Sequence, residues 1–111
     1  MWGETEVHQR RIILSQDAEN EYKNLLYFSY RRWGWEHQQS FRTKFQAGLN
    51  TLANAPYIGK SRDDLLPGIR SFPISIYVVY YQIIDETLRV IHILSDRQNE
   101  ESVEWPGEIG E

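Results

Sequence analysis

The chain has 111 residues, of which 41% are hydrophobic, 14% aromatic and 25% charged, with a formal net charge of −4. That length supports one domain and excludes two, and the apolar content argues against intrinsic disorder. The chain has no cysteine, which excludes disulfide scaffolds, thiolate metal sites and cysteine nucleophiles.

Membrane and targeting signals are missing from the pattern. No apolar run approaches the roughly 18 residues that span a bilayer. The N-terminus carries Glu4 and Glu6 and lacks the apolar core of a signal peptide. We therefore expect a small cytoplasmic protein that does not contact a membrane.

The negative charge is concentrated at one end of the chain. Residues 1–97 hold all twelve bases and eleven of the acids, whereas five acids and no base follow Gln98. We therefore define an acidic C-terminal tail at residues 100–111. The nearly neutral remainder has room for a local basic patch, although ordinary surface charge explains the same composition.

The N-terminal part predicts a lead-in and a short strand. Residues 1–9 are polar and unpatterned, and we expect a flexible N-terminal lead-in there. A single domain then follows at residues 10–99. Arg10 to Leu14 contains three consecutive aliphatic residues between polar ones, which predicts a strand.

The first helix has a start signal and an apolar face. Ser15 is typical of an N-cap, because its hydroxyl accepts a hydrogen bond from an amide left free in the first turn. Asp17 and Glu19 add negative charge where the helix dipole favours it. Helical spacing then continues to about Arg32. The predicted inward face consists of Ala18, Tyr22, Leu25, Leu26 and Ser29.

A second helix is predicted directly after the first. Gly34 interrupts the pattern and is the expected hinge of a helical hairpin. The second helix runs from about Trp35 to Asn54, and Pro56 ends it because proline lacks the amide hydrogen. Its predicted inward face consists of Phe41, Phe45, Gly48, Leu49 and Leu52.

The second half of the chain predicts a loop and three strands. Tyr57 to Gly68 is rich in turn residues, and Ile69 to Ile74 follows as a short strand. Tyr77 to Ile84 is apolar or aromatic at nearly every position, which is typical of a central strand covered on both faces. Asp85-Glu86 is a plausible tight turn before a returning strand at Thr87 to Leu94.

This order, β-α-α-β-β-β, predicts an α+β domain. The helical hairpin is expected to pack on one face of a largely antiparallel four-stranded sheet. The other face of the sheet is expected to stay partly open, and binding or chemistry would take place there.

Several segments of the sequence resemble those of a known family. Over roughly residues 10–99 it is similar to the RelE/ParE superfamily of toxins, and most similar to its ParE branch. The segments that carry the resemblance are Leu14-Ser15-Gln16-Asp17-Ala18, Ala55-Pro56-Tyr57-Ile58-Gly59, Gly68 to Pro73, Tyr77 to Tyr81 and Ile91 to Arg97.

The resemblance implies the toxin of a type II toxin–antitoxin module, with a role in plasmid stabilisation. A cognate ParD-like antitoxin would neutralise it by wrapping a segment around the helical hairpin and the sheet. Operator DNA would be a partner only indirectly, through the antitoxin. ParE members are described as poisoning DNA gyrase, whereas RelE members cut mRNA on the ribosome. Because the two branches share a fold, the fold alone does not choose between them.

Messenger RNA cleavage needs a group that activates the 2′-hydroxyl and cations that hold the scissile phosphate. The resemblance to RelE implies lysines on the second strand, but Ile69 to Pro73 supplies only Arg70. Val78 stands where RelE has an arginine, and Val103 where it has a tyrosine. The neighbouring acids Glu100, Glu101 and Glu104 would repel RNA phosphates.

The sequence therefore favours a gyrase-binding protein over an enzyme. A RelE-like ribosome-dependent mRNA endoribonuclease is the main alternative, and its candidate catalytic residues are Arg70, Arg97 and His92. The simpler interpretation of His92 is a partly buried strand histidine with a hydrogen-bonded ring. An inactive relative that only binds antitoxin is a further alternative.

Two arginines and three aromatic residues are candidate partner contacts. Arg70 and Arg97 match arginines of the family pattern, and they would contact gyrase, its DNA or the antitoxin. Structural ion pairs with Asp63, Asp64 or Asp96 explain the same arginines equally well. Three aromatic side chains fall off the inward face of the first helix and predict a protein-binding patch, namely Tyr27, Tyr30 and Trp33.

Metals and cofactors are not expected. The three histidines are scattered along the chain, and no cysteine accompanies them. Such a pattern does not provide the ligand spacing of a metal site.

Overall fold

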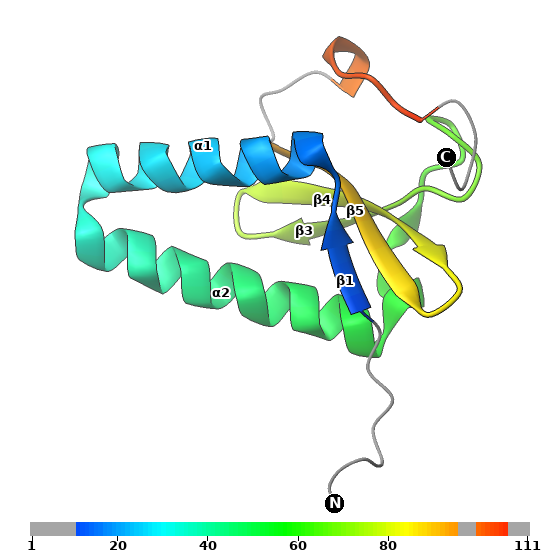
Figure 1. The fold of residues 1–111 in the computed structure, drawn as a ribbon, viewed down its shortest axis with the longest axis horizontal. Coiled ribbons are helices and arrows are strands. Elements are labelled where there is room, and N and C mark those ends of the chain that lie inside the picture. The colour runs from blue at the N-terminus through cyan, green and yellow to red at the C-terminus, as the bar shows by residue number, and fades with distance from the viewer. Residues whose placement is uncertain (1–10, 96–99, 107–111) are drawn as a thin grey trace, which may run out of the picture.

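The computed structural model describes residues 11–95 and 100–106. The predicted lead-in, Arg10, Arg97 and the end of the acidic tail lie outside the described residues. In chain order the elements are β1 (Arg11–Leu14), α1 (Gln16–Trp33), α2 (Trp35–Asn54), the 3₁₀ turn η1 (Pro56–Ile58), β2 (Lys60–Ser61), β3 (Arg70–Ile74), β4 (Tyr77–Ile84), β5 (Thr87–Ser95) and the 3₁₀ turn η2 (Glu100–Ser102). Figure 1 shows α1 and α2 as a hairpin that lies alongside the sheet.

The sheet has five strands in the order β1-β5-β4-β3-β2. β1 runs parallel to β5, and the other three pairs are antiparallel. The α+β class is confirmed, and so is the central position of β4. The prediction missed one strand, β2, because its two polar residues carry no alternating pattern and pair with Arg70 and Ser71 only after the loop folds back.

Helix α1 begins as the sequence predicts. The Ser15 hydroxyl accepts a hydrogen bond from the Ala18 amide at 3.0 Å and donates one to the Ile91 carbonyl at 2.7 Å. The cap therefore also satisfies a backbone group of β5 beyond the end of its ladder with β1. Acids in the first turn and Arg31 and Arg32 in the last turn complement the helix dipole.

Gly34 forms the hairpin turn. Its φ of 94° lies in the left-handed region, where a side chain would be strained. Across the turn, the Gln38 side-chain amide donates to the Leu26 carbonyl at 3.0 Å. The second helix has the predicted bounds, Trp35 to Asn54. Among the described residues, no helix has an apolar stretch long enough to cross a membrane.

The main core lies between the hairpin and the sheet. The predicted inward faces are confirmed at Ala18, Leu25, Leu26, Ser29, Phe45, Leu49 and Leu52, which are all buried. Tyr22 and Phe41 are only partly buried, but both rings pack against Phe45. Full burial of each leucine or phenylalanine contributes about 1.5–3 kcal/mol, so this layer dominates the stability of the fold.

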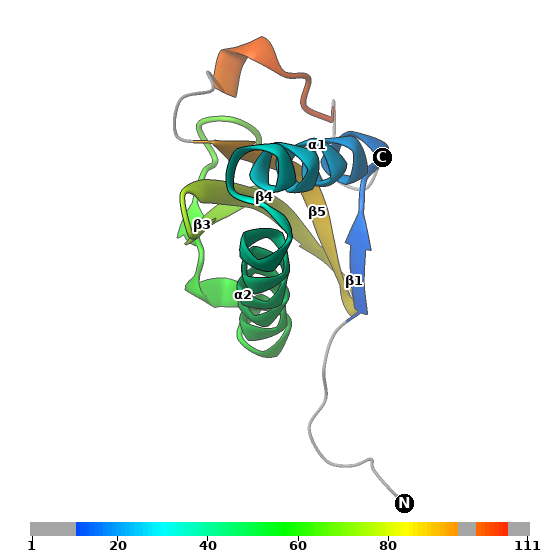
Figure 2. The same ribbon diagram turned by 90° about the vertical axis from the view of Figure 1, so that its left-hand side faces the viewer.

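A second, smaller core covers the opposite face of the sheet. Residues 100–106, here called the strap, lie on the side of the molecule away from α2 (Figures 1 and 2). Val103 and Trp105 of the strap pack against a cluster of buried residues that includes Tyr80 and Ile91. The strap therefore covers part of the face that the sequence was expected to leave partly open. Sequence reasoning missed the cover because acids dominate the strap and only these two side chains pack into the second core.

Candidate functional site

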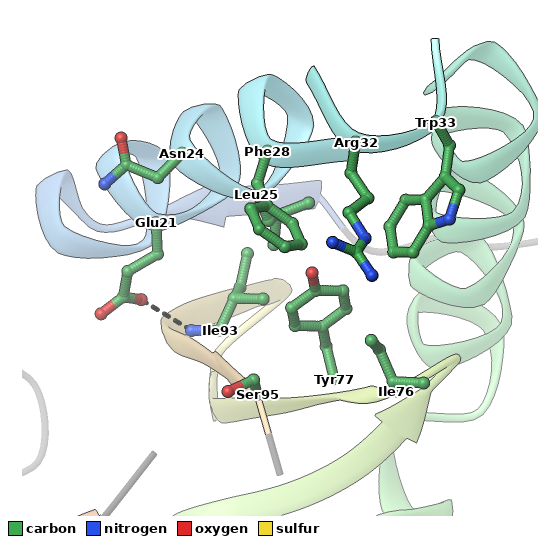
Figure 3. Close-up of a pocket in the computed structure, with 10 residues that line it drawn as sticks. All are labelled: Glu21, Asn24, Leu25, Phe28, Arg32, Trp33, Ile76, Tyr77, Ile93 and Ser95. Carbon is green, nitrogen blue, oxygen red and sulfur yellow. Dashed lines mark hydrogen bonds between the residues drawn. The ribbon is translucent and has the colours of Figure 1, made fainter. Parts of the chain in front are cut away.

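A pocket of about 720 Å³ opens between α1 and the ends of β4 and β5. Six of its lining residues come from α1, one from the β3–β4 turn, and the others from β4 and β5. Figure 3 shows the ten lining residues, which are Glu21, Asn24, Leu25, Phe28, Arg32, Trp33, Ile76, Tyr77, Ile93 and Ser95.

The rim of the pocket exposes large apolar side chains. Phe28 is 54% exposed, Trp33 52% and Ile76 58%. The Phe28 and Trp33 rings meet edge to face with their centroids 5.9 Å apart. Exposed apolar groups gathered around a hollow are typical of a surface that another molecule covers.

Of the two charged side chains that line the pocket, only one is available to bind a ligand. Both carboxylate oxygens of Glu21 are engaged, since Oε1 accepts from the Ile93 amide at 2.7 Å and Oε2 lies 2.8 Å from His92 Nδ1. The Arg32 guanidinium lies 5.6 Å from the Trp33 ring centroid, and it points into the space above Tyr77 (Figure 3). Within residues 11–95 and 100–106 it has no ion-pair partner. The pocket therefore offers a ligand apolar surface and one available cation.

The predicted aromatic patch divides into two parts. Trp33 lines the pocket, whereas Tyr27 and Tyr30 do not, although both are exposed. Arg31 donates a hydrogen bond to the Tyr27 hydroxyl at 2.9 Å. The sequence did not predict that Arg32 and Ile76 line one pocket, because their proximity depends on how the β3–β4 turn meets α1. The spacing of Phe28 and Arg32 by four residues was the one local signal available.

Arg70 lies at a different end of the sheet. Its Nη1 atom donates to the Gly59 carbonyl at 2.6 Å and to the Tyr57 carbonyl at 3.3 Å. Its guanidinium also lies 5.2 Å from the Tyr57 ring centroid. The geometry thus gives Arg70 a structural role in holding η1, while Arg97 falls outside the described residues.

The two loop acids suggested as partners for Arg70 have other partners. Asp63 accepts from the Gly68 amide at 2.9 Å, and Asp64 pairs with Arg62 at 2.9 Å. Both contacts are local, since they join residues within five positions of each other. Neither acid therefore supplies the structural ion pair considered for Arg70.

His92 is buried and fully engaged. It is 1% exposed, its Nδ1 faces Glu21, and its Nε2 lies 2.5 Å from the Glu104 carbonyl oxygen. Trp105 covers the ring edge to face at a centroid distance of 4.8 Å. The interpretation of His92 as a strand histidine with a bonded ring is confirmed, and its burial is more complete than predicted.

The pKa of His92 reflects opposing effects. Burial by itself lowers that pKa, but the hydrogen bonds to Glu21 and to the Glu104 carbonyl, together with the charges of Glu21 and Asp17, raise it above its ordinary value of 6.5. A proton on this ring is therefore held by two contacts at once. In this conformation the ring has no nitrogen free to act as a general base.

Arg62 joins the strap to the sheet, a role that sequence reasoning missed. It donates to both carboxylate oxygens of Glu100, at 2.7 and 2.8 Å. The Tyr80 hydroxyl also donates to Glu100. Burial, and then the bond to Glu100, raise the pKa of Tyr80 to about 12, so this phenol stays protonated.

The other positions relevant to RNA cleavage have packing roles. Val78 is partly buried against the second core, as is Val103 of the strap. The His37 ring lies 4.7 Å from the Trp33 ring. In the part of the chain that the structure describes, no three His, Asp or Glu residues form a group that could hold a metal ion.

Comparison with protein families and curated proteins gives consistent results. Residues 12–100 match the family model described as the ParE toxin of the type II toxin–antitoxin system parDE. The chain is 26% identical over 90 residues to Toxin ParE1 of Mycobacterium tuberculosis (strain ATCC 25618 / H37Rv), covering 80% of this chain and 92% of that protein. It is 28% identical over 81 residues to Toxin ParE1 of Caulobacter vibrioides, covering 71% of this chain and 84% of that protein.

Solved structures share the fold at low sequence identity. A chain of the chromosomal ParDE toxin–antitoxin system from P. aeruginosa superposes with a TM-score of 0.67 at 12% identity, covering 79% of this chain and 97% of that one. A chain of the intact E. coli RelBE toxin–antitoxin complex gives a TM-score of 0.53 at 19% identity, covering 80% of this chain and 99% of that one.

Proposed function

The chain belongs to the ParE toxin family of type II toxin–antitoxin systems, and we propose that it inhibits DNA gyrase when free and is neutralised by a ParD-like antitoxin. The proposal treats the protein as a binding protein rather than an enzyme, acting in the cytoplasm where gyrase works. It takes the gyrase target from the ParE branch and the antitoxin partner from the complexes that share this fold.

The observation that supports gyrase over mRNA is the state of the sheet face opposite the helices. RNA cleavage needs an accessible base and free cations at one place. Here both nitrogens of His92 are engaged, and Arg62 is neutralised by Glu100 and Asp64. Arg70 is bonded to the backbone carbonyls of Tyr57 and Gly59.

The test of gyrase inhibition uses purified gyrase and negatively supercoiled or relaxed plasmid. We expect the wild-type chain to abolish supercoiling and to accumulate cleaved DNA. An Arg97→Ala variant should do so more weakly, whereas an Arg42→Ala variant, which removes an exposed arginine from α2, serves as the matched control. Full gyrase activity at a molar excess of toxin would contradict the proposal, and cleavage of ribosome-bound mRNA would then favour the RelE-like alternative.

For the antitoxin, we propose that an apolar side chain enters the pocket between α1 and β4. Phe28, Trp33 and Ile76 provide the apolar walls, and a neighbouring acid on the antitoxin would pair with Arg32. An aromatic residue at the centre of an interface contributes at least about 2 kcal/mol when it is a hot spot, which is roughly a 30-fold change in affinity.

Two tryptophans two residues apart provide a matched test. Trp33 lines the pocket, whereas Trp35 is 63% exposed and does not line it. We expect Trp33→Ala to weaken antitoxin binding at least about 30-fold and Trp35→Ala to weaken it less than about threefold. Equal losses, or a larger loss for Trp35→Ala, would exclude the pocket as the docking site.

Tyr27 and Tyr30 test where on α1 the antitoxin lies. The sequence predicts that both contact a partner, and they remain candidates on the exposed part of the helix. If Tyr27→Ala and Tyr30→Ala weaken binding more than Trp33→Ala does, the antitoxin covers the outer side of the hairpin and the pocket proposal is wrong. The four variants change exposed side chains, so their unfolding free energies should differ by no more than about 0.5 kcal/mol.

A further inference from the structure

The strap is attached to the sheet through a small number of side chains. Glu100 binds Arg62 and Tyr80, and the Trp105 ring lies against the Tyr80 ring at a centroid distance of 5.2 Å. Within the described residues it pairs with neither β4 nor β5 as a strand. The position of the strap therefore depends on individual side-chain contacts rather than on a cooperative ladder.

His92 makes the contact that links the strap to α1. Its Nδ1 faces a carboxylate oxygen of Glu21, and its Nε2 faces the carbonyl oxygen of Glu104. Both of these oxygens are acceptors. A neutral imidazole has only one N–H, so either tautomer leaves a lone pair facing an acceptor oxygen. Only the imidazolium satisfies both contacts.

We propose that the His92 imidazolium is a pH-sensitive latch that holds the strap on the sheet, and that loss of its ring proton releases the strap. Release uncovers Tyr80, Ile91 and Leu94, which the strap helps to bury, and leaves Arg62 without its Glu100 partner. Strap release takes place in the isolated chain and requires neither gyrase nor an antitoxin.

Deprotonation breaks the hydrogen bond between the ring and the strap. A hydrogen bond to a carboxylate is stronger than one to a neutral carbonyl, so the remaining proton stays on Nδ1 and faces Glu21. Nε2 then turns a lone pair toward the Glu104 carbonyl, and the two repel. Glu21 stays in place because its other oxygen also accepts from the Ile93 amide.

The groups around the ring set the direction of the pH effect. The His92 ring faces Glu21 of α1 and feels the charge of Asp17 on the same helix. The strap contributes the Glu104 carbonyl and the Trp105 ring. β4 contributes Tyr80, whose hydroxyl donates to Glu100, the partner of Arg62. Glu21 and Asp17 favour the charged ring whether the strap is closed or open, whereas the hydrogen bond to the Glu104 carbonyl favours it only when the strap is closed. In the proposed latch this hydrogen bond outweighs the burial that the strap adds, so the closed strap binds the proton more tightly than the open one.

Because opening is coupled to loss of the His92 proton, the opening constant of the strap depends on pH in a defined way. Below the pKa that the ring has in the open state, His92 is protonated in both states and the opening constant does not change with pH. Between that pKa and the higher pKa of the closed state, opening releases one proton, so the opening constant rises up to about tenfold per pH unit. Above the raised pKa it is constant again.

The experiment measures opening in the full chain between about pH 5.5 and 9, a range that brackets the ordinary pKa of histidine. The reporter is hydrogen exchange at the Trp105 indole N–H, which donates to the Glu100 carbonyl at 3.1 Å, corrected for the intrinsic pH dependence of exchange. A parallel NMR titration of the His92 ring gives its pKa. We expect the rise in opening to end at that pKa.

Three variants make the test decisive. His92→Gln should abolish the slope, and Glu21→Gln should move it to lower pH because the carboxylate charge is removed. His37→Gln, which removes an exposed histidine from α2, should leave it unchanged. A flat wild-type profile, a slope that survives in His92→Gln, or a His92 pKa at or below the ordinary 6.5 would each overturn the latch. If His92→Gln fails to fold, the shift of the opening profile to lower pH in Glu21→Gln tests the latch in its place.

Discussion

The Arg62 guanidinium donates two hydrogen bonds to the Glu100 carboxylate, at 2.7 and 2.8 Å, across 38 positions of the chain. The pair ties the loop before β3 to the first residue of the strap. Its side chains are 16% and 30% exposed, so solvent screens the interaction only in part. Two parallel contacts of this kind fix orientation as well as distance.

Acid should loosen this end of the strap. The hydrogen bond from Arg62 is the largest effect on Glu100 and holds its pKa below the ordinary value of 4.5. Because the folded-state pKa is lowered, this contribution to strap attachment is complete above pH 4.5 and is lost as the pH falls through the folded-state pKa. Trp105 exchange measured from about pH 5.5 down to about 3 should show the strap opening.

The same measurement on Glu100→Gln isolates the carboxylate. We expect this variant to weaken strap attachment by about 1 kcal/mol near neutral pH and to remove the acid-dependent opening. Asp64→Asn provides the comparison, because Asp64 pairs with the same guanidinium but its side chain is 63% exposed. An equal effect of the two substitutions would mean that Glu100 has no special role.

Gly59 is required for space rather than for backbone conformation. Its φ of −70° suits any residue, but an added Cβ would collide with the Tyr81 hydroxyl and lie 2.9 Å from its ring. That hydroxyl donates to the Pro56 carbonyl at 2.6 Å and accepts from the Gly59 amide at 3.1 Å. Gly59→Ala should therefore lower the unfolding free energy by about 1–3 kcal/mol in denaturant titrations.

A double-mutant cycle checks this explanation. Tyr81→Phe alone should cost about 1–3 kcal/mol, because it leaves buried backbone groups without their partner. In the double variant the hydroxyl that meets the new methyl group is gone, so the combined cost should be smaller than the sum of the two. Strict additivity would show that the methyl group is accommodated elsewhere.

The charge of Arg32 should affect how fast an antitoxin binds. Arg31 and Arg32 are both exposed in the last turn of α1, but only Arg32 lines the pocket, and Arg31 is bonded to the Tyr27 hydroxyl. We expect Arg32→Gln to slow association with an acidic antitoxin segment several-fold at low salt and Arg31→Gln to slow it less. Stopped-flow measurements at two salt concentrations compare them. A salt dependence that is unchanged in Arg32→Gln would remove this residue from the interface.

A substitution of Arg70 can distinguish a role in stability from a role in partner binding. Removing its guanidinium leaves the Gly59 and Tyr57 carbonyls without their donor, so Arg70→Ala should lower the unfolding free energy by about 1–2 kcal/mol. Denaturant titration measures this cost, and gyrase inhibition is then assayed at a temperature where the variant is fully folded. Inhibition that is retained assigns Arg70 to the fold, whereas a folded variant that no longer inhibits makes it a partner contact.

Much of the fold follows from local chemistry and was predictable. Ser15 caps α1, Gly34 turns the hairpin, and Asn54 ends α2 just before Ala55 and Pro56. These features depend on the residue itself and its neighbours within one helical turn. The apolar run of β4 likewise predicts a central strand, because only a strand covered on both faces buries every position.

The order of the sheet was less accessible from the sequence. β2 consists of two polar residues, and it becomes a strand only because the loop brings Lys60 opposite Ser71. The strap similarly gives little local signal, since acids dominate it and only Val103 and Trp105 pack into the second core. In each case a distant pairing, not the segment's own pattern, decides the structure.

The sequence by itself determined the family, the two amphipathic helices and the strands with an apolar run. The reason is that helix and strand periodicity appears in the spacing of apolar residues that are close together in the sequence. The tertiary structure alone decided the pocket at Trp33 and Ile76, the carbonyl contacts of Arg70 and the double contact of His92. His92 meets Glu21 across 71 positions of the chain. The physical reason is that a charge or a ring acquires its role from the groups that folding places beside it, and those groups are not its neighbours in the sequence.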